Sequence, residues 1–320
     1  MGYNKAKQFS VLLLTAVILA GCSEQRSSFL DPAGPIAAAQ RAHLIEVVGW
    51  TMIAVVPVFI LVPVMLWRYR YRNTKARYTP DWGYSGWLEL VMWGVPFMIV
   101  AVLSTKLWFS TKALDPYKPI ASDAAPLNVQ VVGLDWKWLF IYPDLGIATV
   151  NQLAFPAGAP VSLNLTSDTV MQSFMVDALA GQVYAMPGMR TKLHLLADAA
   201  GVFKGENVQF SGVGFTEQKF DAVAMTPEAF SEWVARVKSD GVPLDAQTYE
   251  LLGASSTGAQ VYEAIGTNGM PAGVIYFNQV APDLFKKVIG RYHGGEPVLP
   301  ANQPGAAGYV WQPLFNGSSK

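Results

Sequence analysis

The chain has 320 residues and equal numbers of basic and acidic side chains, so its formal net charge is zero. Hydrophobic residues make up 52% of the sequence and charged residues only 14%, a composition typical of membrane proteins rather than soluble ones. Apart from one short basic segment, no run of charge indicates a nucleic acid or another polyanion as a partner, and the length allows two domains at most.

The N-terminus has the pattern of an export signal. Lys5 and Lys7 precede an apolar run at 11–18 that is too short to span a bilayer. The sequence LAGC at 19–22 resembles the lipobox of bacterial lipoproteins. This implies a signal peptide over residues 1–21, cleavage before Cys22 and acylation of its thiol, which would hold the mature chain in membrane lipid. The alternative for Cys22, the single cysteine of the sequence, is a small buried thiol in an ordinary helix.

Two apolar segments predict a pair of transmembrane helices. After an N-terminal segment at 22–43, which we expect on the periplasmic side, the first span covers 44–67. The second span covers 87–109, with Glu89 near one end and Lys106 near the other. Each is long enough to cross about 30 Å of hydrocarbon as a helix.

The loop between the two spans, at 68–86, is strongly basic at its beginning. Its cations are Arg68, Arg70, Arg72, Lys75 and Arg77. The positive-inside rule places such a loop in the cytoplasm. Cys22 and everything after Phe109 then lie on the periplasmic side of the inner membrane, which agrees with the lipobox.

A linker at 110–125, rich in proline and alanine, precedes a β-rich region. Five segments have the composition of strands, at 127–133, 136–142, 161–167, 173–179 and 190–196. With Pro- and Gly-containing turns between them, they predict an antiparallel sandwich or barrel over 126–226. Alternation in the second segment predicts that Trp136 and Trp138 share one face of a sheet.

The region 227–293 is predicted to be helical. Thr226 as N-cap, Pro227 at the first helical position and Gly241 at the end delimit one helix. Its apolar face carries Phe230, Val234 and Val237. Residues 281–293 predict a second short helix, and the Gly- and Pro-rich end at 294–320 predicts a flexible tail.

The two membrane helices, together with the stretches at 133–161, 170–195 and 210–225, resemble subunit II of the haem-copper respiratory oxidases. The likeness extends from about residue 30 to 285 and is closest to the quinol-oxidase branch, the cytochrome bo-type ubiquinol oxidases. It implies a membrane hairpin followed by a periplasmic, cupredoxin-like Greek-key β-sandwich with C-terminal helices.

Cytochrome c oxidases of this superfamily bind a copper pair here, through an upstream His and a loop of the form C-x-E-x-C-x3-H-x2-M. Two bridging thiolates are essential to that centre. The corresponding positions here are Gln172 for the upstream histidine, Phe210 and Gly214 for the cysteines, Gly212 for the glutamate, Gln218 for the loop histidine and Asp221 for the methionine. No Cys, His or Met occurs at 208–221.

The resemblance therefore implies that this chain binds no metal or other cofactor. Its three histidines stand at none of the ligand positions; they are His43, His194 and His293. For His194, in an alternating strand, we expect a structural or surface role.

Without the copper pair, cytochrome c has no electron acceptor in this chain, so the implied donor is ubiquinol. In the family, the large subunit I oxidises quinol and holds the haems and copper at which oxygen is reduced to water. The implied partners are subunit I, smaller membrane subunits and ubiquinol, but neither cytochrome c nor nucleic acid.

Glu89 is the candidate for a direct role. The resemblance places it at the mouth of the proton channel that leads into the large subunit. The alternative is an ordinary carboxylate that the dipole favours near a helix N-terminus. For Trp136 and Trp138 we expect a packing role, with the large-subunit interface as the alternative.

Two other functions remain open at this level. One is a cytochrome c oxidase subunit with a lost or atypical copper site, and the missing ligands count against it. The other is a non-enzymatic membrane lipoprotein that senses or binds a ligand, which leaves the family likeness unexplained.

Overall fold

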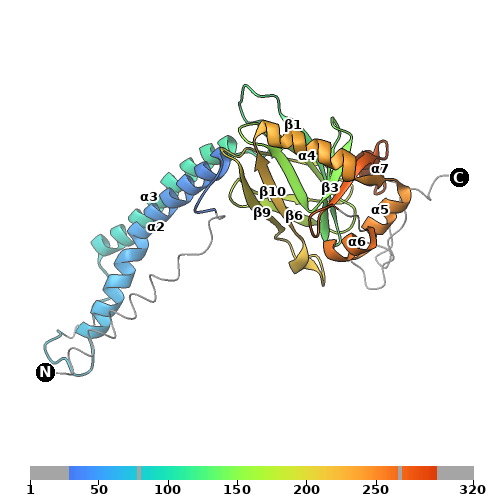
Figure 1. The fold of residues 1–320 in the computed structure, drawn as a ribbon. Coiled ribbons are helices and arrows are strands. Elements are labelled where there is room, and N and C mark those ends of the chain that lie inside the picture. The colour runs from blue at the N-terminus through green and yellow to red at the C-terminus, as the bar shows by residue number, and fades with distance from the viewer. Residues whose placement is uncertain (1–28, 78–80, 266–268, 294–320) are drawn as a thin grey trace, which may run out of the picture. The chain divides into compact units, whose positions relative to one another are not determined.

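The computed structural model describes residues 29–77, 81–265 and 269–293 (Figure 1). The expected signal peptide at 1–21, Cys22 and the expected tail at 294–320 lie outside the described residues. The chain divides into two compact units, one at 38–121 and the other containing residues before 38 and after 121. The first unit is helical and the second is built on β-sheets.

The helical unit is a hairpin of two long helices, α2 (Pro35–Arg68) and α3 (Gly86–Ala113). Both are long and apolar enough to cross a membrane. α2 begins nine residues before the expected span, because an alanine-rich stretch continues the helix back to Pro35, a residue well suited to a first helical position. Within the hairpin, the Lys106 ammonium pairs with the Glu46 carboxylate, which links the two helices by charge.

The described strands of the second unit form two sheets. The seven-stranded sheet has the order β11-β12-β3-β2-β1-β5-β8. Its strands are β1 (Leu127–Leu134), β2 (Lys137–Tyr142), β3 (Ile147–Val150), β5 (Val161–Ser167), β8 (Thr191–Leu195), β11 (Val242–Leu244) and β12 (Ile275–Val280). The five-stranded sheet has the order β4-β10-β9-β6-β7. Its strands are β4 (Gln152–Pro156), β6 (Gln172–Val176), β7 (Ala180–Ala185), β9 (Gly201–Asn207) and β10 (Lys219–Met225).

The five strand-like segments of the sequence form β1, β2, β5, β6 and β8, so the predicted sandwich is confirmed. β1 pairs in parallel with β5, and β4 with β10, while most other neighbours are antiparallel. In these two pairs the neighbouring strands are not consecutive in the sequence, so the chain crosses between the two sheets, as in Greek-key sandwiches.

The core between the sheets is aromatic at its centre. Trp138 and Phe140 of β2 face Phe174 of β6 and Phe220 of β10, and all four side chains are buried. The rings of Phe174 and Phe220 are stacked with centroids 4.9 Å apart, and Trp138 meets Phe174 edge to face at 5.2 Å. Such contacts stabilise beyond the area that they bury.

The C-terminal region, 227–293, is helical only in part. Its helices are α4 (Pro227–Asp240), α5 (Ala246–Gly253), α6 (Gly258–Ile265) and α7 (Leu284–Gly290). It also supplies β11 and β12, which extend the seven-stranded sheet through the pairing of β12 with β3. The apolar run at 274–277 adopts a strand because the free edge of β3 satisfies its backbone and buries its side chains. Hence the C-terminal region and the sandwich share one sheet.

Helix α4 has the predicted caps: the Thr226 hydroxyl accepts a hydrogen bond from the Ala229 amide at 3.3 Å, and Pro227 opens the helix. Its most buried side chains are Trp233 and Val237. Trp233 was not among the expected apolar positions. Its indole stacks on Phe230 and donates to the Gln152 carboxamide at 3.0 Å, which attaches α4 to β4.

Candidate functional site

The positions that correspond to copper ligands lie mostly at one end of the sandwich, where the loops before β6 and before β10 meet. Gln172 opens β6 and Gln218 immediately precedes β10, and both side chains are completely buried. The Gln218 amide nitrogen donates to the Gln172 side-chain oxygen at 2.6 Å. The two residues that stand for the family's histidines therefore bind each other directly.

Each of these carboxamides is further satisfied by its surroundings. The Leu134 carbonyl accepts from both Nε2 atoms, at 3.1 Å in each case. Gln172 also donates to the Thr169 hydroxyl at 3.2 Å. Gly133 makes room for this arrangement, since a β-carbon at that position would lie 2.2 Å from the Gln172 oxygen.

Asn207, at the end of β9, extends the network and was not singled out by the sequence. Its Nδ2 donates to the Gln218 oxygen at 2.9 Å and to the Ser211 hydroxyl at 3.0 Å. Its Oδ1 accepts from the backbone amides of Ser173 and Gln209. A single asparagine thus joins both loops, and only its polarity at the end of a strand distinguishes it in the sequence.

Trp136 occupies the surface of the loop that would carry the thiolates. It lies in the turn before β2 rather than in the strand, so the expectation that it shares a sheet face with Trp138 is wrong. The turn sets its indole against Gly214, where a β-carbon would lie 2.3 Å from the ring, while Trp138 enters the core. Glycine at 214 is therefore required by this ring.

Phe210 and Asp221 are not brought into the network. The Phe210 side chain is 73% exposed and contacts the Phe215 ring. Asp221 lies on the other side of β10 and forms an ion pair with Lys204 of β9 at 2.5 Å. Among the described residues, no group of three or more His, Cys, Asp or Glu side chains could hold a metal ion. Carboxamides hydrogen-bonded to each other, with no thiolate beside them, do not fit a copper pair.

The histidines have other surroundings. His194 lies in β8 opposite Ser162, and burial together with the charge of Lys192 lowers its pKa. The His293 ring is hydrogen-bonded to the Gly188 carbonyl at 2.6 Å. His43 is half-buried in α2.

A buried lysine fastens the β1–β2 turn to the C-terminal region. The Lys137 ammonium donates to the carbonyls of Asp135 at 2.5 Å, Ser256 at 2.8 Å and Ala254 at 3.1 Å. Burial lowers the pKa of Lys137 to about 7, although the charge of Asp135 acts in the opposite direction. Backbone hydrogen bonds between Trp136 and Ser256, and between Ser256 and Asp135, complete the attachment.

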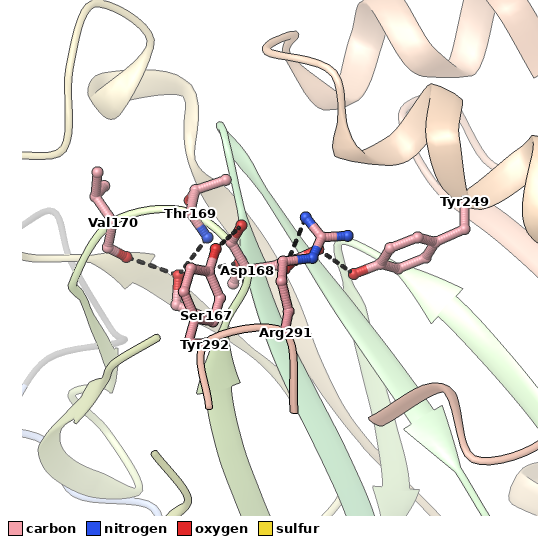
Figure 2. Close-up of polar contacts among 8 residues, drawn as sticks. Ser167, Asp168, Thr169, Val170, Tyr249, Arg291 and Tyr292 are labelled. Atoms are coloured by element: carbon pink, nitrogen blue, oxygen red, sulfur yellow. Dashed lines mark hydrogen bonds and ion pairs between the residues drawn. The ribbon is translucent and has the colours of Figure 1, made fainter. Parts of the chain in front are cut away.

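A second charged contact fastens the loop that leads into β6. Figure 2 shows Tyr249 of α5 and Arg291, which follows α7, converging on Asp168, whose carboxylate is completely buried. Tyr249 donates to this carboxylate at 2.8 Å, and the Arg291 guanidinium pairs with it at 3.2 Å. The Tyr292 hydroxyl donates to the Asp168 carbonyl. Burial and the neighbouring Asp168 charge both raise the pKa of Tyr249, so the phenol remains a donor.

Glu89 lies in the first turn of α3, as expected, and its side chain is exposed in the described chain. It is the acidic residue of that helix; the rest of α3 is apolar except for polar and basic residues toward its C-terminal half.

Comparison with known proteins shows which proteins this chain is similar to. The family model for the periplasmic domain of cytochrome c oxidase subunit II matches residues 145–220. The chain is 40% identical to cytochrome bo(3) ubiquinol oxidase subunit 2 of Pseudomonas putida, over 92% of this chain and 89% of that protein. It is 41% identical to ubiquinol oxidase subunit 2 of Acetobacter aceti, over 88% and 87% of the two chains. The solved periplasmic domain of cytochrome oxidase subunit II from Bradyrhizobium japonicum aligns with 37% of this chain and 95% of its own, at 19% identity and a TM-score of 0.35.

We predict that Gln218→Met weakens this end of the sandwich, because it leaves the Gln172 oxygen and one Asn207 donor unpaired in a buried place. The expected cost of local opening is about 1–3 kcal/mol. Hydrogen exchange, measured by mass spectrometry on the full-length chain, should accelerate by about tenfold or more in peptides at 170–176 and 217–223.

The double variant Gln172→Met/Gln218→Met should recover part of this loss, because both partners are then apolar. Gln247→Met, which changes an exposed glutamine of α5, is the matched control and should leave exchange unaltered. Unchanged exchange in Gln218→Met would contradict the assigned role of the amide pair.

Proposed function

Because the chain belongs to the subunit 2 family of the bacterial ubiquinol oxidases, which are haem-copper oxidases with a cupredoxin-like sandwich in this subunit, we propose that it serves its oxidase without carrying an electron itself. The observation that supports this is the direct hydrogen bond between Gln172 and Gln218. Carboxamides cannot be oxidised or reduced reversibly by respiratory donors, so this end of the sandwich offers no electron acceptor.

The electron donor is then ubiquinol, and cytochrome c is not a partner. Quinol oxidation and the reduction of oxygen to water take place in the large subunit I, which holds the haems and copper of the complex. The present chain contributes the two membrane helices and the periplasmic sandwich that assemble with subunit I and the smaller membrane subunits. Two exposed apolar helices provide surface both for that assembly and for lipid.

The protein is a bacterial inner-membrane protein, and its orientation is part of the proposal. The basic loop after α2 is cytoplasmic, in accordance with the positive-inside rule. The sandwich, and the N-terminal segment before α2, are then periplasmic. This arrangement suits a chain whose N-terminus carries an export signal.

We include in the proposal that Cys22 is acylated after cleavage of residues 1–21. Cys22→Ser should abolish incorporation of radiolabelled palmitate into the chain, because no other thiol is present in the sequence. Labelling that persists in the variant would refute the lipobox assignment. Since two membrane helices remain, the variant should still fractionate with the membrane.

Glu89 is proposed to receive protons at the cytoplasmic mouth of a channel into the large subunit. Its position in the first turn of α3, with an exposed side chain at the basic end of the hairpin, makes it accessible to water and to a neighbouring subunit. An ionisable residue at the edge of the hydrocarbon is a strong functional candidate.

The donor assignment is tested by oxygen uptake of the complex purified through this chain. With ubiquinol as substrate, uptake should be robust; with reduced cytochrome c it should not exceed the rate without enzyme. Uptake with cytochrome c would show an electron acceptor outside the amide pair and overturn the proposal. Absence of uptake with either donor, in a preparation that contains haem, would also oppose it.

The role of Glu89 is tested with Glu89→Gln, which removes the exchangeable charge while preserving size. We expect ubiquinol-supported turnover to fall by up to about tenfold, equivalent to about 1.4 kcal/mol in the barrier, with the loss greatest at alkaline pH where protons are scarce. Subunit content and haem content should be unchanged. Asp81→Asn, which changes an exposed carboxylate on the loop that precedes α3, is the control and should retain full turnover. Equal turnover of wild type and Glu89→Gln across the pH series would remove Glu89 from the proton path.

A further inference from the structure

The last residue of α2 and the beginning of the loop that follows it are strongly basic. The five basic side chains are all exposed; they are Arg68, Arg70, Arg72, Lys75 and Arg77. In the described part of the chain, no ion pair involves any of them. The acidic residues nearest in sequence are Asp81 and Glu89, so the loop has a positive excess.

This basic segment is folded back on the end of α2 by Asn73. The Asn73 backbone amide donates to the Arg70 carbonyl at 2.9 Å, and its side-chain amide donates to the Arg68 carbonyl. The Lys75 amide in turn donates to the Asn73 side-chain oxygen at 3.2 Å. These turns keep the basic side chains close in space to the C-terminal end of α2.

Aromatic side chains surround the same end of the hairpin. Those exposed on the α2 side are Trp67, Tyr69 and Tyr71, and those on the α3 side are Trp82, Tyr84 and Trp87. The Arg70 guanidinium lies 5.6 Å from the centre of the Trp67 ring. Because tryptophan and tyrosine concentrate at the level of the lipid headgroups, this aromatic group places the cations at that level.

The opposite end of the hairpin has no comparable excess. There, Lys106 is paired with Glu46, and Lys112 lies over the Trp108 ring at 4.4 Å. The neighbouring charges are of both signs, with Arg41 and Lys118 accompanied by Asp115. The two ends of the hairpin therefore present different charges to the two membrane surfaces.

We propose that the segment 68–77 binds the phosphate groups of anionic phospholipids at the membrane surface where α2 ends and α3 begins. Arginine guanidinium groups match phosphate oxygens in bidentate geometry, and the aromatic rings bury against the glycerol and upper acyl region. A zwitterionic lipid binds less tightly, because its own ammonium or choline group is repelled by the same cations. This binding depends on the helices spanning the membrane and not on the identity of the electron donor.

Charge and position favour lipid over a protein partner. An acidic surface of a neighbouring subunit would have to cover the cations and also leave the surrounding aromatic rings in place at the hydrocarbon boundary. Lipid headgroups satisfy both groups of side chains at once, because phosphate and acyl chain belong to the same molecule. The segment therefore has the pattern of a headgroup site rather than of a subunit contact.

The test uses the purified oxidase containing the full chain, delipidated in a neutral detergent. Phosphatidylglycerol and phosphatidylcholine with identical acyl chains are titrated in parallel, and bound lipid on this subunit is counted by native mass spectrometry. Wild type should prefer phosphatidylglycerol. Arg70→Gln/Arg72→Gln/Lys75→Gln should reduce that preference by roughly fivefold per cation removed, on the order of a hundredfold in all.

Three comparisons make the result specific. Lys112→Gln/Lys118→Gln, at the opposite end of the hairpin, should leave the preference unchanged. Arg70→Lys/Arg72→Lys keeps the charge and should lose only a small part of it. In wild type, a tenfold increase in salt should reduce the preference, and millimolar inorganic phosphate should not displace phosphatidylglycerol, because free phosphate lacks the acyl chains.

Two results would overturn the inference. One is an equal preference in wild type and in the triple glutamine variant. The other is dissociation of the large subunit from that variant with its lipid preference intact, which would assign the cations to a protein contact. If the triple variant fails to insert, the salt titration of the wild type decides: a preference insensitive to salt excludes a site of this charge.

Discussion

The buried hydrogen bond between Gln172 and Gln218 is the constraint on which one end of the sandwich depends. A buried carboxamide is tolerated only when its donors and acceptor are paired, and each unmet group costs about 1–3 kcal/mol. Here the Leu134 carbonyl and Asn207 supply the remaining partners, so three strands and two loops are fixed by one network. Hydrogen bonds therefore hold this end of the sandwich together.

The C-terminal region is attached to the sandwich through buried charged groups, which also need partners. Lys137 and Asp168 are both completely buried, and a buried charge is costly without partners. The partners come from the C-terminal region: carbonyl oxygens of Ala254 and Ser256 for the ammonium, and Arg291 with Tyr249 for the carboxylate. Removing that region would take these partners away from both charges, so it is part of the folding unit of the sandwich rather than an appendage.

The sequence predicted those elements whose signal is local. Alternating strands such as β5, and a helix with both caps such as α4, are specified by neighbouring residues. The pairing of β12 with β3 is not specified by neighbouring residues, because the paired residues Ile275 and Val150 are far apart in the sequence. Trp136 was misplaced for a related reason: alternation cannot show where a turn ends and a strand begins.

The site was predictable to a similar extent. Alignment to the family loop identified Gln172 and Gln218, and the structure brings them together. It also suggested Asp221, whose side chain instead pairs with Lys204, because successive residues of β10 face opposite sides of the sheet. Asn207 and the partners of Asp168 belong to no motif and are recognised only once the strands are in register.

The layer beneath the amide pair explains why the fold persists without a metal. Phe174 follows Gln172 by two residues within β6, so these two side chains point to the same side of the strand, and Phe220 lies at the start of β10, two residues after Gln218. The two phenylalanine rings stack on each other and are packed against Trp138 and Phe140. This apolar layer packs β6 and β10 against β2 beneath the amide pair. The amide pair is therefore supported from below by an apolar layer that needs no metal, and the fold of the domain is separable from the chemistry of its end.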